Sequence, residues 1–226
     1  MTERLIVITP HLGDAVQGCG ELIAAHPGAV VVTVFAEIPA DAYVVSEWDA
    51  LCGFSSPRQA VTVRRREDRL AMDVLDAEPC WLACRDSQYR SLRKTPAQAL
   101  EDEISLKLTR ALRRHGRSRA ALPLGLLAGD HTLAHRAALR LVRRRTDMDW
   151  IAYEDGTAPA DTVAARLASL ERLGLAAASM EAPPREAVYR KEQAVRRYES
   201  LLRGYAAAGR PVPFAAGAER YWRLSK

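Results

Sequence analysis

Apolar positions along the chain fall into two alternating patterns. Short runs of consecutive apolar residues are typical of strands that are covered on both faces. These runs lie at 4–9, 29–35, 80–83, 119–124 and 149–153. Between them, apolar residues recur every three or four positions, which indicates amphipathic helices at 14–25, about 60–76, 97–115 and 131–145. This alternation predicts an α/β fold with an open, mainly parallel, Rossmann-like sheet and helices on both faces.

The pattern continues beyond the fifth expected strand. A loop after Tyr153 leads to an expected helix near 160–173, a short strand at 175–181 and a long helix at about 185–208. The chain has 226 residues, of which 48% are hydrophobic and 27% charged, so it can bury one substantial core. We therefore expect a single domain over 1–226.

Composition narrows the classes of partner. No apolar stretch approaches the roughly 20 residues that a membrane span requires, and the first residues lack a secretion signal, so we expect a cytoplasmic protein without a membrane partner. The net charge of +5 comes from arginine clusters without interleaved aromatic residues, so we expect no nucleic acid. An anionic small substrate is compatible with this charge. The four cysteines form no CxxC pair and are expected to be buried free thiols.

Three residues with metal-binding chemistry are expected at one edge of the sheet. His11 and Asp14 directly follow the first strand, and His131 follows the strand that ends near Leu124. Open α/β sheets bind ligands at the carboxyl ends of their strands. Two histidines and one carboxylate leave an open coordination position, which suits catalytic Zn²⁺ or another divalent transition metal.

Other interpretations of these residues remain open. Asp14 with Gln17 resembles a capping box, and Asp130 can cap the helix that begins at His131, without any metal. His135 stands four residues after His131, as in an HExxH zinc helix, but Thr132 replaces the glutamate base. We therefore expect His135 to be exposed or half-buried. The dinucleotide fingerprint GxGxxG is missing, because the glycines of "QGCGEL" fall inside the expected helix.

Several segments together resemble the motifs of one family, the LmbE-like or PIG-L de-N-acetylases. The opening motif is similar to "TPHLGDAVQGCGELIA", and the later motifs resemble "RRREDRLAMDVLDA", "DSQYR", "PLGLLAGDH", "YEDGTAP", "KEQAVRRYES" and "ERYWRL". The similarity extends in order over nearly the whole chain. It implies a Rossmann-like fold and a hydrolase that removes an acetyl or other acyl group from an N-acyl amino sugar or a related amine.

The resemblance also implies roles for particular residues. The metal, Zn²⁺ or another divalent ion, would be bound by His11, Asp14 and His131. Substrate contacts would come from Arg66, Tyr89 and Arg90. The implied partner is a small amino-sugar-like molecule or another N-acyl substrate. The resemblance is compatible with an oligomer.

Two positions depart from the family pattern. Gly13 stands where the family has its general base, and Ala128 stands where it has a histidine that stabilises the oxyanion or assists the leaving amine. Each loss is typically worth roughly 100- to 10,000-fold in rate. Candidate substitutes are Asp130 and Glu154, with Asp155 and His135 as alternatives.

These departures leave three hypotheses for the activity. The first is a zinc-dependent hydrolase of C–N bonds with altered chemistry. The second is a catalytically inactive protein that binds a sugar-like ligand or a partner. The third is a metal-dependent esterase, because an ester has a better leaving group and does not need the lost acid.

Overall fold

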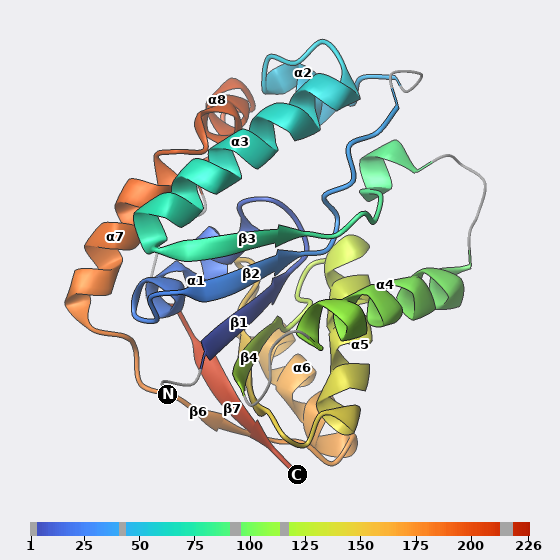
Figure 1. Ribbon diagram of the computed structural model, residues 1–226, viewed down its shortest axis with the longest axis vertical. Coiled ribbons are helices and arrows are strands. Elements are labelled where there is room, and N and C mark those ends of the chain that lie inside the picture. Colours follow the sequence, from blue (N-terminus) through green and yellow to red (C-terminus); the bar gives the residue numbers. More distant parts are fainter. Residues whose placement is uncertain (1–3, 41–43, 91–95, 114–117, 213–218) are drawn as a thin grey trace.

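Residues 4–40, 44–90, 96–113, 118–212 and 219–226 are described by the computed structural model, and within them seven strands form one sheet (Figure 1). The strand order is β3-β2-β1-β4-β5-β7-β6. The strands are β1 (Arg4–Thr9), β2 (Ala29–Thr33), β3 (Ala77–Trp81), β4 (Ser118–Pro123), β5 (Asp149–Tyr153), β6 (Ala176–Ser179) and β7 (Tyr221–Ser225). The first five pair in parallel, whereas β7 is antiparallel to both β5 and β6. The predicted fold class is confirmed.

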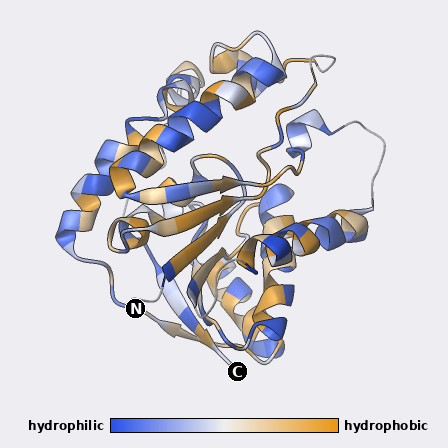
Figure 2. Ribbon diagram, viewed as in Figure 1, coloured by the Kyte–Doolittle hydropathy of each residue, from blue (hydrophilic) through white to orange (hydrophobic). Residues whose placement is uncertain are grey.

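Helices cover both faces of the sheet because alternate strand residues point to opposite sides. Ile6 and Ile8 belong to a core that contains residues of α4 (Ala97–Leu112), α5 (Asp130–Arg144) and α6 (Ala160–Arg172). Leu5 and Val7 belong to a second core with residues of α1 (Asp14–Ala24), α3 (Pro57–Leu75) and α7 (Arg185–Val195). Figure 2 shows apolar strands between helices with polar outer faces. The near-continuous apolar runs of the strands therefore reflect burial on two sides.

Local signals explain where the predicted helices begin and end. α3 begins at Pro57, because the Ser56 side chain accepts a hydrogen bond from the backbone N–H of Gln59 and proline is favoured in the first turn. The end of the helix predicted at 97–115 lies outside the described residues. Three short elements were not predicted, namely α2 (Glu47–Leu51), the 3₁₀ turn η1 (Ser87–Tyr89) and β7.

The helix predicted at 185–208 is wrong as a single element, because it is broken into α7 and α8 (Glu199–Ala207). Contacts with α3 fix the break. The Tyr198 hydroxyl donates to an Asp68 carboxylate oxygen at 2.8 Å. The Ser200 backbone N–H donates to Glu67 Oε1 at 2.7 Å, so a carboxylate from another helix satisfies the first turn of α8.

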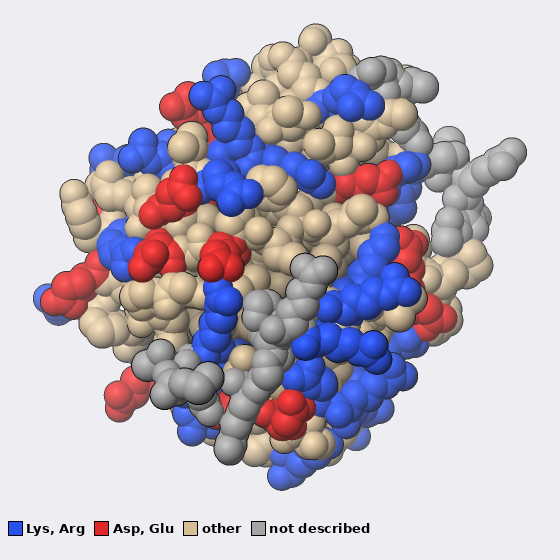
Figure 3. All heavy atoms as spheres, viewed as in Figure 1, with Lys and Arg blue, Asp and Glu red and all other residues tan. Residues whose placement is uncertain are grey.

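Positively charged side chains gather on one part of the molecular surface. Figure 3 shows lysine and arginine side chains gathered over the part of the molecule where α4 and α5 lie. Cys19, Cys52 and Cys84 are buried free thiols, and Cys80 is half-buried. Within the described ranges, no helix combines the length and the apolar character that crossing a membrane requires.

Candidate metal centre

The candidate centre lies at the carboxyl end of β1, where the strand order turns from β2 on one side to β4 on the other. β1 pairs with β2 on one side and with β4 on the other, so the loops that follow β1 and β4 diverge at its carboxyl edge. His11 lies in the first of these loops and Asp14 begins α1, whereas His131 is the second residue of α5. The topology therefore brings together residues that are about half the chain apart in sequence.

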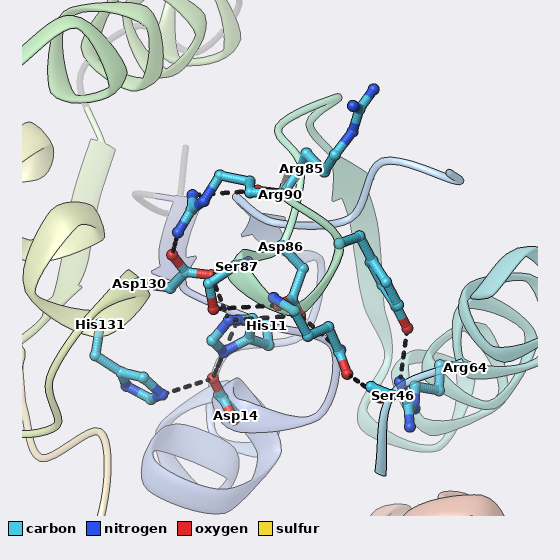
Figure 4. Close-up of polar contacts among 12 residues, drawn as sticks. His11, Asp14, Ser46, Arg64, Arg85, Asp86, Ser87, Arg90, Asp130 and His131 are labelled. Carbon is cyan, nitrogen blue, oxygen red and sulfur yellow. Dashed lines mark hydrogen bonds and ion pairs between the residues drawn. The ribbon is translucent and has the colours of Figure 1, made fainter. Parts of the chain in front are cut away.

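The donor atoms of these three residues form a compact group (Figure 4). His11 Nδ1 lies 3.0 Å from Asp14 Oδ2, and His131 Nε2 lies 3.5 Å from the same oxygen. One ligand atom from each residue lies within 4.8 Å of the others. A cation of ordinary coordination geometry can therefore be shared by two imidazoles and a carboxylate.

A carboxylate stands behind each histidine. His131 Nδ1 is 2.7 Å from Asp155 Oδ2, and His11 Nε2 is 3.3 Å from Asp130 Oδ2. A neutral imidazole that donates through one nitrogen presents the lone pair of the other, and this pairing is the usual second layer around metal-binding histidines. The donor set and its supporting carboxylates therefore fit a divalent transition metal.

The capping interpretation of the two aspartates is wrong. Gly13 and Gly129 occupy the N-cap positions of α1 and α5, and neither helix has a side-chain cap. Asp14 is instead inside its helix and accepts a hydrogen bond from the His11 backbone N–H at 3.0 Å. The Asp130 carboxylate contacts Ser87, Arg90 and His11 instead. Helix capping therefore does not account for either aspartate.

Electrostatic coupling keeps the carboxylates of the site ionised. Burial by itself would raise the pKa of Asp14, but the hydrogen bond from His11 and the nearby His131 lower it. The pKa of Asp130 is also lowered, because the His11 contacts and the Ser87 N–H outweigh burial. Burial disfavours the cationic form of His11, yet its hydrogen bonds to Asp130 and Asp14 raise its pKa well above the ordinary value.

The structure places Asp130 behind His11 rather than in a cavity. Its side chain is 2% exposed, and it accepts hydrogen bonds from the Ser87 backbone N–H at 2.8 Å and from Arg90. With its oxygens engaged in this way, Asp130 can hold the His11 imidazole. The structure therefore does not bring Asp130 to the position that a substitute base would need.

Glu154 and Asp155 diverge although they are neighbours. Glu154 pairs with Arg220 at 2.5 Å, so the structure does not bring it to the candidate centre. Asp155 accepts from the Leu126 backbone N–H at 3.1 Å and contacts His131. His135, expected to be at least partly exposed, is buried, and its Nδ1 lies 2.8 Å from the Pro123 carbonyl oxygen. Burial lowers the pKa of His135 to about 4.

The arginine of α3 that reaches the site is not the predicted one. Arg66 is exposed, whereas Arg64 is buried and pairs with Asp49 at 2.7 Å. Two residues along a helix turn the side chain by about 200° to the opposite face. Tyr89 is also buried and donates to Asp49 at 2.6 Å, while Arg90 pairs with Asp130. The spacing of buried positions Ala60, Arg64 and Ala71 is the signal that favours position 64.

A pocket of about 260 Å³ opens beside His11 and Asp14. Its wall includes Asp86, whose Oδ2 lies 3.7 Å from His11 Nε2. Trp48 of α2 and Leu201 of α8 also line it. Sequence reasoning did not identify Trp48 and Leu201, because they belong to elements whose position depends on contacts between distant segments. Asp86 begins the motif "DSQYR" but received no role there.

The two departures from the family pattern have different surroundings. Gly13 has a φ of 96°, and a Cβ added there would lie 2.9 Å from Leu201 Cδ1 and 3.5 Å from the Tyr198 ring. Ala128 is exposed in the loop before α5. An apolar side chain therefore stands over position 13, whereas position 128 faces open space.

No family model matches the sequence, and no curated protein matches it either. Solved structures do match. A zinc-inhibited form of a teicoplanin deacetylase has a TM-score of 0.75 at 20% identity, with 98% of each chain covered. A deacetylase of the A40926 pseudoaglycone has a TM-score of 0.78 at 21% identity, covering 100% of this chain and 98% of the other. The N,N'-diacetylchitobiose deacetylase from Pyrococcus horikoshii has a TM-score of 0.56 at 15% identity, covering 99% and 84%. These likenesses establish the fold.

Proposed function

We propose that the chain is a member of the LmbE-like de-N-acetylases and a metal-dependent hydrolase that removes an acyl group from an N-acyl amino sugar or a related amine. The observation that carries this proposal is the group of His11, Asp14 and His131 with a carboxylate behind each imidazole. The deacetylase structures with the same fold support it. A single domain over 1–226, a cytoplasmic location and the absence of a nucleic-acid partner stay predictions.

Each residue of the centre has a distinct role in this proposal. A bound divalent ion, Zn²⁺ in the first instance, would polarise the scissile carbonyl and make water more acidic. His11, Asp14 and His131 would hold it, and Asp130 and Asp155 would keep the two imidazoles in the required orientation. A small substrate would enter the adjoining pocket, where Ser87 and Gln88 offer hydrogen-bonding groups.

The second candidate is a protein that binds a sugar-like ligand without chemistry. It is favoured by one observation, the apolar contact of Leu201 over Gly13 where a base would stand. A third candidate is ester hydrolysis, which places less demand on protonation of the leaving group. A hydratase, the 4-carboxy-2-hydroxymuconate hydratase GalB, also has this fold with a TM-score of 0.51 at 16% identity, so the fold alone does not choose among them.

Metal content and turnover test the proposal together. We expect about one divalent ion per chain in protein purified without chelator, lost in His131→Ala but retained in the control His26→Ala. Chelator-sensitive hydrolysis of N-acetylglucosamine derivatives would support the hydrolase. Metal without turnover of any N-acyl sugar would favour the binding protein, and aryl-ester turnover lost in His11→Ala would favour the esterase. Absence of metal from the wild type would contradict the centre itself.

A further inference from the structure

The two edges of the sheet are formed by strands of opposite character (Figure 1). β3 forms one edge. It contains Pro79, which lacks a backbone N–H, and the exposed Glu78, which pairs with Arg4 at 2.7 Å. β6 forms the other edge with the sequence AAAS, and three of its four residues are exposed. Proline and charged side chains on an edge strand hinder pairing with another chain, so β3 has this protection and β6 lacks it.

The ladder between β6 and β7 determines which backbone groups of β6 face outward. The Met180 N–H donates to the Tyr221 carbonyl oxygen at 2.9 Å, directly after the paired residues of β6. In an antiparallel ladder, residues that exchange hydrogen bonds with the partner strand alternate with residues whose N–H and C=O point away from it. Ala178, two positions before Met180, therefore bonds to β7. The N–H and C=O groups of Ala177 and Ser179 point outward from the sheet.

A groove of about 400 Å³ lies between α6 and the end of β6. Its lining includes the exposed or half-buried apolar side chains Ala164, Leu167, Met180 and Ala182. Arg220 also lines the groove, and its charge is paired with Glu154. Leu173 follows α6 and precedes β6, and it is 46% exposed. An exposed leucine therefore stands at the start of the edge strand, and a largely apolar groove lies at its end.

We propose that two copies of the chain form a dimer in which β6 pairs with β6 across a two-fold axis. Such an axis makes identical strands antiparallel. The outward groups of Ala177 in one copy then exchange hydrogen bonds with those of Ser179 in the other, and Ala178 lies opposite Ala178. A shift toward the start of the strand would need the N–H of Leu175, which already donates to the Leu170 carbonyl oxygen at 3.0 Å. This inference does not depend on the proposed function.

Antiparallel pairing also brings Leu173 of each copy to the groove of the other. The start of one β6 then lies beside the end of the second, where Met180 and Ala182 line the groove. The charges match in the same way, because the exposed Arg172 precedes the strand and the exposed Glu181 follows it. A stable dimer buries about 1,200–2,000 Å² in total. A strand of four residues is too small for this area, so the groove and Leu173 complete the interface.

Molecular mass in solution tests the dimer. In sedimentation of the full chain, the mass should rise with protein concentration to twice that of one chain. A chain that stays monomeric up to about 100 μM, where even a weak dimer is populated, would overturn the proposal.

A charge at the two-fold axis tests the pairing of the strands. Ala178→Lys places like charges opposite each other, in a pair whose Cα atoms would lie only about 4.5 Å apart. The dissociation constant should rise about tenfold or more. Ala207→Lys is the control, because this exposed alanine ends α8, which lies far from β6 (Figure 1). An equal effect of the two changes would contradict the interface.

Mixing Ala178→Lys with Ala178→Glu restores attraction at the same position. The mixed dimer should be about tenfold tighter than either variant alone, because opposite charges then face each other. Its formation would also show that both variants are folded. If no mixed dimer forms, the pairing of Ala178 with Ala178 is wrong.

Leu173→Ser tests the groove without changing β6, and it therefore serves also if Ala178→Lys does not fold. Leu106→Ser is the matched control, because Leu106 is 50% exposed and lies on α4. Leu173→Ser should weaken the dimer about tenfold or more, whereas Leu106→Ser should not. Equal dissociation constants in the two variants would overturn the groove contact. Metal content should be the same in all these variants, since none of them changes the candidate centre.

Discussion

The first turns of α1 and α5 have similar sequences, but their aspartates have different roles. Each helix follows a glycine with positive φ, Gly13 or Gly129, and each has an aspartate as its first residue. Asp14 shares an oxygen between two histidines, whereas Asp130 is held by Ser87 and Arg90 behind one of them. Two similar sequence patterns therefore place one carboxylate in the candidate centre and the other in its support.

The surroundings decide this difference, not the local sequence. Position 13 lies beneath α8, and Leu201 occupies the space above it. Nothing lies within 4 Å of a Cβ added at Gly129 among the described atoms. The helix whose aspartate contacts both histidines is thus the one whose N-terminus is covered by another helix, and the supporting aspartate belongs to the helix whose N-cap is open.

The largest expected effect is loss of the metal in Asp14→Asn. The amide oxygen of asparagine carries no formal charge and is a weaker ligand for a divalent transition metal, so the candidate centre would lose its only anionic ligand among His11, Asp14 and His131. Elemental analysis of purified protein should find no stoichiometric divalent ion in this variant. Retention of one ion per chain would show that the two aspartates do not differ in the way described above.

A charged side chain at either N-cap glycine tests the covering by α8. Gly13→Asp should lower the free energy of unfolding by roughly 2–5 kcal/mol, because backbone strain at positive φ adds to overpacking against Leu201. Gly129→Asp has the strain without the overpacking and should cost less. Urea unfolding measures both variants. Adding Leu201→Ala to Gly13→Asp should restore part of the loss, and failure to do so would contradict the assigned contact.

A pH effect is expected one turn further along α5. The pKa of His135 is about 4 in the folded protein and 6.5 ordinarily, so the unfolded chain binds the proton more tightly. Its contribution to stability is fully present above about pH 6.5 and is lost as the pH falls toward 4, by about 3 kcal/mol in total. His135→Gln should flatten the dependence of the unfolding free energy on pH in this window. A dependence as steep in this variant as in the wild type would contradict the expectation.

The smallest effect is expected at the supporting aspartate. Asp130→Asn keeps the shape of the side chain but weakens its hold on the His11 imidazole, and such changes typically cost roughly 10–100-fold in metal affinity. Competition with a fluorescent chelator measures this affinity. A loss as complete as that of Asp14→Asn would place Asp130 among the direct ligands and would remove the distinction between the two helices.

Sequence patterns predicted the elements whose signals are local. β1, β2, β4 and β5 were predictable because burial on both faces leaves little freedom in composition. β3 is a partly exposed edge strand, and it shares only residues 80 and 81 with the strand predicted at 80–83. The break between α7 and α8 was not, since the apolar stripe continues through Tyr198 while the contacts that end the helix come from Glu67 and Asp68. β7 was also missed, because Arg223 interrupts its three apolar residues and its pairing partners are distant in the sequence.

The residues of the candidate site also differ in whether local sequence patterns could predict them. His11, Asp14 and His131 could be named because each follows a strand in a parallel sheet, and topology alone brings such positions together. Arg64 could have been preferred to Arg66 from the spacing of the buried face of α3. The positions of Trp48, Leu201 and Tyr205 in the pocket lining could not be predicted, because α2 and α8 come together through tertiary contacts between distant segments, among them the close approach at Gly204.

The position of β7 has a consequence for the order in which the chain acquires its structure during synthesis. β7 lies between β5 and β6, and among the described strands β6 pairs only with β7. The ribosome therefore releases β6 before the strand that ties it to the sheet. Until residues 221–225 emerge, the outer edge of β5 presents unpaired backbone groups, which makes the nascent chain prone to intermolecular strand pairing at this stage.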